Sequence, residues 1–263
     1  MDKPHDGATK DLARSLPEGL LVSRDWLYTH GFTRPNVDSY LRSGKLQAVT
    51  RGVYRRPGPP LKWEHVVYSL RVLGYSVHVG GRSALEMQGF AHYLNMAAWK
   101  TVDLFGVRHL PTQFLEMGDS IDLVVHGTSL FASLPDQALT TKPFGHWDWQ
   151  IDYATPELAL LEYLSEIEDE SGFMVADKFF ESATSLRPDL VTKLLEACMQ
   201  VKAKRLFMWF ATRHQQPWLK LVSLDGVDLG RGKRMIVRGG ALDNQFQITV
   251  PKEMKLGQPA DIF

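Results

Sequence analysis

Only one cysteine, Cys198, occurs in this chain of 263 residues, so no disulfide can form within one molecule. Cysteine-rich zinc sites are excluded for the same reason. No apolar run is long enough to cross a bilayer, and the first residues are too polar for a signal peptide. We therefore expect a cytoplasmic protein that does not associate with membranes.

Motifs for catalysis and cofactor binding are also missing. The chain has no Gly-x-Ser-x-Gly elbow, no His-Glu-x-x-His pair, no P-loop and no dinucleotide fingerprint. Asp103 and Asp122 fall in predicted strands, as nuclease carboxylates often do, but neither is followed by Glu-x-Lys. Histidines at His78, His126 and His146 are more often structural than ligands. We expect no metal, no cofactor and no enzymatic activity.

The net charge of the chain is zero, but the charge is unevenly distributed. Residues 1–60 hold ten Lys and Arg side chains and six Asp and Glu side chains, which leaves a net charge of −4 for the remaining residues. Residues 20–60 alone hold seven basic and two acidic side chains. A basic segment on a mildly acidic body favours a DNA-binding module joined to a domain with another task.

The pattern of residues 20–57 predicts a winged helix-turn-helix. Ser23 and Thr33 are suitable N-cap residues for two short helices, and glycines follow the end of each helix. Two short strands are then expected at 46–50 and 53–56, with a tight reversal between them. Two helices followed by a hairpin are typical of proteins that bind duplex DNA.

The outward face of the second helix supplies most candidates for DNA contact. Arg suits guanine and Asn suits adenine in the major groove, so Arg34 and Asn36 are candidates for reading bases. Asp38 lies on the same face and needs a cytosine amino group or a nearby Arg as its partner. The candidate DNA-binding residues are Ser23, Arg34, Asn36, Ser39, Arg42, Lys45, Arg51, Arg55 and Arg56.

The proline-rich stretch 56–60 is the strongest break in the chain. It predicts a winged helix-turn-helix over 1–58 and a larger α+β domain over 59–263. Helices are expected at 10–16 and 63–73, after Gly81, from Thr155 and over 190–213 with a break near 200–202. Strands are expected at 75–79, 101–107, 121–126, 147–153, 218–223, 235–237 and 246–250. The acidic stretch 166–170 is expected to be a solvated helix end.

A second basic cluster occurs late in the chain. Its candidate partner-binding residues are Lys204, Arg205, Arg231, Lys233, Arg234 and Arg238. An equally good interpretation is a basic strand and turn that balances the acidic body.

Five segments, taken in their order along the chain, resemble the AbiEi-type antitoxins of type IV toxin–antitoxin (abortive infection) systems. They are LVSRDWLYTHGFTRPNVDSYLRSGKLQAVTRGVYRRPG, VHVGGRSALEMQGF, TPELALLEYLSE, KAKRLFMWFATRHQQPWLKLVSLDGVDLGRGKRMIVRGG and FQITVP. The usual Pro-Glu-Arg-Ala of the family is Pro156-Glu157-Leu158-Ala159 here, which leaves the start of that helix intact.

The resemblance implies two functions. The N-terminal domain would bind inverted repeats in double-stranded operator DNA and repress its own operon. The C-terminal domain would neutralise a nucleotidyltransferase-like toxin as part of phage defence, in many cases without a stable complex. Two alternatives stay open: a DNA-targeted nuclease with a dispersed carboxylate site, and a winged-helix module that contacts proteins.

Overall fold

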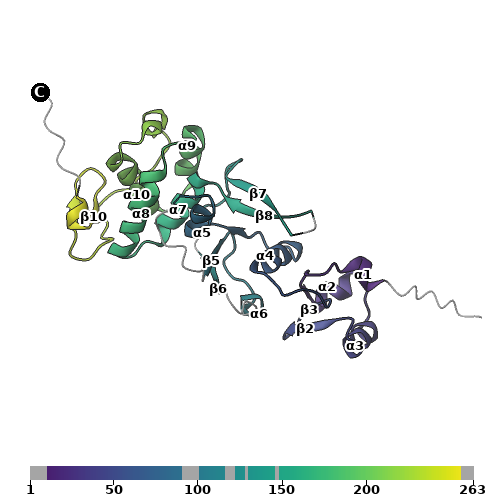
Figure 1. Ribbon diagram of the computed structural model, residues 1–263. Coiled ribbons are helices and arrows are strands. Elements are labelled where there is room, and N and C mark those ends of the chain that lie inside the picture. The colour runs from purple at the N-terminus through teal and green to yellow at the C-terminus, as the bar shows by residue number, and fades with distance from the viewer. Residues whose placement is uncertain (1–10, 91–100, 116–121, 128–129, 146–147, 256–263) are drawn as a thin grey trace, which may run out of the picture.

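A winged helix-turn-helix forms the N-terminal end of the molecule (Figure 1). The computed structural model describes residues 11–90, 101–115, 122–127, 130–145 and 148–255. The winged helix contains a three-stranded antiparallel sheet with the strand order β1-β3-β2. The elements are α1 (Leu12–Ser15), β1 (Val22–Ser23), α2 (Arg24–Thr29), α3 (Arg34–Arg42), β2 (Gln47–Thr50) and β3 (Val53–Arg55). This arrangement confirms the predicted winged helix, with α1 shorter than expected.

Both helices of the motif begin at the predicted N-caps. The Ser23 hydroxyl accepts the N–H of Trp26 at 3.1 Å, and the Thr33 hydroxyl accepts the N–H of Asn36 at 3.4 Å. Gly52 turns the chain between β2 and β3 with a φ of +84°, a conformation that other residues adopt at a cost. Local capping and turn residues therefore account for the ends of these elements.

A mixed five-stranded sheet forms the centre of the body. Its strands are β4 (His78–Val79), β5 (Thr101–Phe105), β6 (Asp122–Val125), β7 (Leu139–Phe144) and β8 (Trp149–Ala154). The spatial order is β6-β5-β4-β8-β7. β5 runs parallel to β6 and β4 parallel to β8, whereas β4 with β5 and β7 with β8 are antiparallel pairs. The predicted α+β class is confirmed.

The two faces of this sheet meet different helices. On one face, Val102 and Leu104 pack with α4 (Trp63–Val72) and α6 (Thr112–Leu115). The other face lies against α5 (Gly81–Met87) and α7 (Pro156–Glu166). Because side chains alternate along a strand, Asp103 and Phe105 point toward α5 and α7.

A helical layer and a small hairpin complete the body at the end opposite the winged helix (Figure 1). Aromatic side chains of α8 and α10 fill its core, and nine residues of α10 are buried. The elements are α8 (Glu170–Ser182), α9 (Pro188–Ala197), α10 (Val201–Arg213), η1 (Pro217–Leu221), β9 (Ala241–Asp243), β10 (Ile248–Val250) and η2 (Lys252–Met254). The predicted break in the segment 190–213 is confirmed between α9 and α10.

Several expected elements differ in the structure. The segment 218–223 was expected as a strand, but most of it lies in the 3-10 helix η1, where Trp218 is buried in the helical core. The stretch 235–237 forms no strand, although the neighbouring Arg234 makes a single bridge to Ile248. α8, β7 and β9 were not predicted. α7 begins directly after Thr155, as predicted, although the Thr155 hydroxyl makes no capping bond.

The winged helix and the body share a packed contact. Leu21 and Val53 belong to the same core as the inward side chains of α4. The backbone N–H of Leu21 donates to the Ser69 hydroxyl at 2.9 Å. Trp149 of β8 packs in the core of the winged helix, and the ring of Tyr68 stacks on it with centroids 4.3 Å apart. The division at residue 58 stays a prediction.

None of the described helices has the length and apolar character needed to span a membrane.

Candidate functional site

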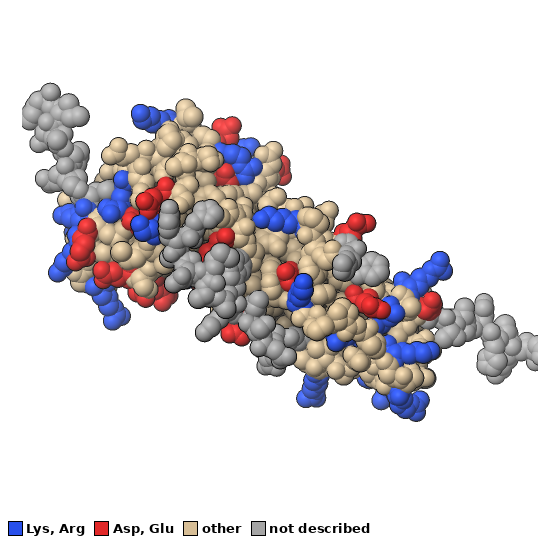
Figure 2. Space-filling model, in the orientation of Figure 1, with Lys and Arg blue, Asp and Glu red and all other residues tan. Residues whose placement is uncertain are grey.

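The helix α3 presents an exposed polar face on the winged helix. The Arg34 side chain is 78% exposed, and Ser39 and Arg42 are exposed along the same helix. Lys45 and Arg51 are exposed after α3 and at the tip of the wing, respectively. Many Lys and Arg side chains project from this end of the molecule (Figure 2). These five candidate residues are therefore accessible to a ligand in the structure.

Asp38 has the arginine partners that its position requires. One carboxylate oxygen lies 3.9 Å from Arg24 Nη2, and the other lies 4.0 Å from Arg34 Nε. Arg24 Nε donates to the Tyr54 hydroxyl at 3.1 Å, which ties α2 to β3. These contacts reduce the repulsion between Asp38 and an approaching phosphate.

Four other candidates make structural contacts. Ser23 is the N-cap of α2, and the Asn36 side chain accepts from the backbone N–H of Thr33 in a capping box. Arg55 donates to the carbonyl of Pro59 at 3.0 Å. Arg56 donates to the carbonyls of Ala13 and Leu16, both at 3.3 Å, and lies near Glu18. These four side chains would have to leave such contacts, wholly or in part, to reach DNA.

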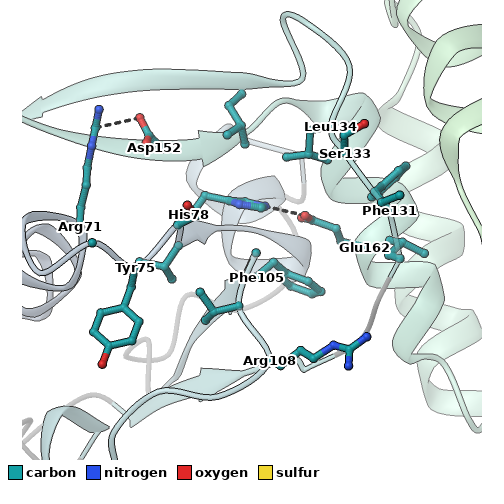
Figure 3. A pocket seen from close by; sticks show the side chains of 18 of the residues that line it. Arg71, Tyr75, His78, Phe105, Arg108, Phe131, Ser133, Leu134, Asp152 and Glu162 are labelled. Atoms are coloured by element: carbon teal, nitrogen blue, oxygen red, sulfur yellow. Dashed lines mark hydrogen bonds and ion pairs between the residues drawn. The ribbon is translucent and has the colours of Figure 1, made fainter.

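A cleft of about 860 Å³ opens in the body beside β4 (Figure 3). At its floor, His78 Nε2 lies 2.6 Å from Glu162 Oε1, and both side chains are at most 5% exposed. The second Glu162 oxygen accepts the N–H of Gly81 at 3.0 Å. Phe105 and Phe131 line the walls, and an ion pair joins Arg71 to Asp152 at the rim. The cleft thus combines apolar walls with a paired polar floor.

A second polar cluster centres on His126. Its Nε2 lies 2.8 Å from Asp103 Oδ1 and its Nδ1 lies 3.1 Å from Glu166 Oε2. Burial disfavours the charged ring, but hydrogen bonds to the two carboxylates outweigh burial and raise the pKa of His126 to about 9. Asp103 also accepts from the Ser83 hydroxyl at 2.8 Å. The cluster joins α5, β5, the end of β6 and α7 through charged hydrogen bonds.

Within the described residues, these clusters form neither a nucleophilic triad nor a metal site. Ser83 donates to Asp103 and not to a histidine, so the Ser-His-Asp order of a nucleophilic triad is not formed. Among the residues that the structure describes, no three His, Cys, Asp or Glu side chains are placed to hold a metal ion. Asp122 is exposed and faces Thr101 in the register of β5 and β6. His146 lies outside the described residues.

The late basic cluster separates into two sets. Lys204 and Arg205 are each 4% exposed, because α10 is buried on nearly all sides. The expectation of a partner-binding surface position is therefore wrong for these two residues. The exposed set is Arg231, Lys233, Arg234 and Arg238.

The sequence interpretation missed the buried carboxylates of α7. Glu157 is paired with Arg187 at 2.9 Å, and Glu162 is paired with His78. Both lie at buried positions within a leucine-rich helix. A charged residue in such an apolar pattern signals a buried pair, but its partner is far away in the sequence.

Comparison with known proteins identifies the family. The sequence profile described as "Transcriptional regulator, AbiEi antitoxin, Type IV TA system" matches residues 99–251, and the profile of the corresponding N-terminal domain matches residues 6–96. No curated protein sequence matches significantly. The fold is similar to the crystal structure of the RV2827C protein from Mycobacterium tuberculosis, with a TM-score of 0.52 and 14% identity over 91% of this chain and 88% of that chain. The chain belongs to the AbiEi family of antitoxins and transcriptional regulators of type IV toxin–antitoxin systems.

Proposed function

We propose that this chain represses its own operon by binding duplex operator DNA through α3 and the wing. The observation that carries this proposal is the exposed polar face of α3, with Arg34, Ser39 and Arg42 accessible on a winged helix. A recognition helix of this kind enters the major groove, where Arg reads guanine. Lys45 and Arg51 would then contact phosphates on either side and set the register.

The contacts made within the winged helix divide the candidate DNA-binding residues by role. Arg34 and Arg42 act as base or phosphate ligands, whereas Arg56 supports the position of α1 through backbone carbonyls. Asn36 stabilises the start of α3 and reads adenine only if its side chain leaves the capping box. Inverted repeats would be bound by two copies of the chain, one on each half-site.

The body acts as the antitoxin and works in the cytoplasm without catalysis. Its partner is a nucleotidyltransferase-like toxin encoded in the same operon. Membership of the antitoxin family supports this part of the proposal. The paired state of the His78, Asp103 and Glu162 side chains also favours a structural role for them.

Two measurements in growing cells test the two parts separately. Expression of a reporter driven by the DNA upstream of the gene should be repressed by the wild-type chain. The double variant Arg34→Ala with Arg42→Ala should fail to repress it. Co-expression with the neighbouring toxin should restore growth. Repression without rescue would overturn the antitoxin part, and rescue without repression would overturn the DNA-binding part.

A further inference from the structure

The cleft beside β4 has the size and the wall chemistry of a small-molecule site. Its volume of about 860 Å³ lies within the range of roughly 300–1,000 Å³ that such sites span. Phe131 lies on one side of it, and Arg71 and Asp152 lie on the other (Figure 3). Met199 and Leu139 also line it and are 53% and 37% exposed. A ligand in the cleft would remove this apolar surface from water, which favours binding.

His78, on the floor of the cleft, presents one ring nitrogen to it. Nε2 lies 2.6 Å from Glu162 Oε1, and because a carboxylate only accepts hydrogen bonds, this nitrogen carries the proton. The side chain is 5% exposed. Nδ1 has no hydrogen-bond partner among the described residues, yet it is not fully enclosed. In the neutral ring, Nδ1 therefore presents its lone pair to an N–H or O–H group of a ligand.

Gly106 keeps this nitrogen accessible. It lines the same cleft, and a Cβ atom at this position would lie 3.2 Å from His78 Nδ1, closer than side chains usually approach. Its φ of +96° is also a conformation that glycine adopts more readily than other residues. A side chain here would crowd the nitrogen.

The charges along the cleft give a ligand one orientation. The buried carboxylate of Glu162 lies beside His78 and repels a negatively charged group at the floor. Arg71 and Arg108 line the cleft and are exposed to solvent. Among the described residues, the hydrogen bonds of Arg71, including the one to Asp152 at 3.1 Å, all use Nη1, so Nε and Nη2 can bind an anion. A ligand therefore binds with a hydrogen-bond donor at the floor and its negative charge toward the arginines.

Simpler ligands match only part of this arrangement. An inorganic anion would leave the apolar walls uncovered. An aliphatic chain would cover the walls but would bury Nδ1 without a donor, which is unfavourable. A nucleotide meets every requirement, because the base has two apolar faces, an amino group donates from its edge, and the phosphate binds arginine. Adenine alone among the common bases carries an amino group and no carbonyl oxygen that Glu162 would repel.

We propose that the cleft binds an adenine nucleotide. The amino group of the base donates to His78 Nδ1, the base packs against Phe131, and the phosphate binds Arg71 and Arg108. The site lies in the body and uses no residue of the winged helix. This inference therefore goes beyond the proposed function and does not depend on it.

Calorimetric titration of the full-length chain with three ligands tests the site. AMP carries both the amino group and the phosphate, purine riboside 5′-monophosphate lacks the amino group, and adenosine lacks the phosphate. We expect AMP to bind with one-to-one stoichiometry and each of the other two to bind at least about tenfold more weakly. The difference between AMP and adenosine should shrink as salt is added, because ions screen the charges of the exposed arginines.

Two variants assign the contacts. In His78→Gln the side-chain amide can still donate to Glu162 but has no counterpart of Nδ1, so AMP should lose its advantage over purine riboside 5′-monophosphate. Arg71→Gln should weaken AMP binding at least about fivefold and leave adenosine binding unchanged. Its matched control is Arg82→Gln, because Arg82 is 49% exposed against 48% for Arg71 and also pairs with a carboxylate, that of Glu86, but does not line the cleft. Urea unfolding checks that each variant is folded.

Three outcomes overturn the proposal. No binding of AMP to the wild-type chain overturns it outright. Equal affinities for AMP and purine riboside 5′-monophosphate overturn the contact with His78, and this comparison on the wild-type chain decides the contact if His78→Gln does not fold. Unchanged AMP affinity in folded His78→Gln and Arg71→Gln, or an equal loss in Arg82→Gln, would place the nucleotide outside this cleft.

Discussion

His126 Nε2 lies 2.8 Å from Asp103 Oδ1, at a point where the end of β6 meets the middle of β5. The other ring nitrogen lies 3.1 Å from Glu166, the last residue of α7. One imidazole therefore connects the sheet to α7 through two carboxylates. The positive charge on this ring stabilises the folded state through these two hydrogen bonds, so the free energy of unfolding depends on pH.

We expect stability to fall at alkaline pH. The pKa of His126 is raised from 6.5 to about 9, so the charged ring stabilises the fold fully below pH 6.5 and loses this effect as the pH rises through about 9. The loss should reach up to about 3 kcal/mol. Urea unfolding between pH 6 and pH 10 measures it. His126→Gln should remove this pH dependence, whereas His109→Gln, at an exposed position, should preserve it.

The same cluster predicts the opposite trend in acid. A hydrogen bond from His126 lowers the pKa of Glu166, and hydrogen bonds from His126 and Ser83 outweigh burial and lower that of Asp103. Their stabilisation is complete above the unfolded pKa values and is lost as the pH falls through the lower folded ones. An unfolding free energy that is flat from pH 3 to pH 10 would contradict both assignments.

Removing the Glu162 carboxylate should be strongly destabilising. Glu162→Ala leaves His78 Nε2 and the N–H of Gly81 without their partner in a buried site. We expect a loss of about 3–5 kcal/mol in the free energy of unfolding. Glu181→Ala is the matched control, because Glu181 is 61% exposed and, among the described residues, its ion-pair partner is the exposed Lys178. A cost for Glu162→Ala no larger than that of the control would show that the pair is not structural.

Gly106 should be intolerant of a side chain. Its φ is +96°, and a Cβ atom there would lie 2.4 Å from the carbonyl oxygen of Ser76 at the edge of the cleft. Gly145 also has a positive φ, of +71°, but a Cβ atom there would meet open space. Gly145→Ala should cost about 1 kcal/mol from backbone strain alone. Gly106→Ala should cost clearly more, as measured by urea unfolding, and equal costs would contradict the close approach.

Local signals predicted the winged helix well. Ser23 and Thr33 act as N-caps and a glycine turns the wing, so neighbouring residues alone determine these elements. The body was predicted less well, because η1 and α8 depend on distant partners. The sequence pattern predicts a strand around Trp218. In the structure its ring is buried in the helical core, and its indole N–H donates to the carbonyl of Ala183.

The candidate site shows the same division. The outward positions of α3 follow from helical periodicity, and Arg34, Ser39 and Arg42 are exposed as predicted. Periodicity did not show that Arg56 reaches back to carbonyls 40 or more residues earlier in the chain. It also did not show that Arg205 is buried, because only the packed tertiary structure surrounds α10 on all sides.

The capping box predicts different effects for two neighbouring residues of α3. Asn36→Ala removes a cap and should lower the stability of the helix by about 1 kcal/mol. Arg34→Ala should leave stability nearly unchanged, because its side chain is 78% exposed. Its effect should be on DNA affinity, by about 1–3 kcal/mol if it reads a base. Thermal unfolding and DNA titration of both variants separate these roles, and a stability loss confined to Arg34→Ala would contradict the assignment.

The most direct test of the account is the affinity of the full-length chain for DNA upstream of its own gene. Fluorescence anisotropy compares the wild-type chain, Arg34→Ala with Arg42→Ala, and the control Lys193→Ala with Lys220→Ala. We predict that wild type and control bind this DNA more tightly than a scrambled duplex, and that the α3 variant loses at least about 30-fold in affinity. No binding at low salt to any upstream fragment, or equal affinity of the α3 variant and wild type, would contradict the assignment of α3 as the recognition helix.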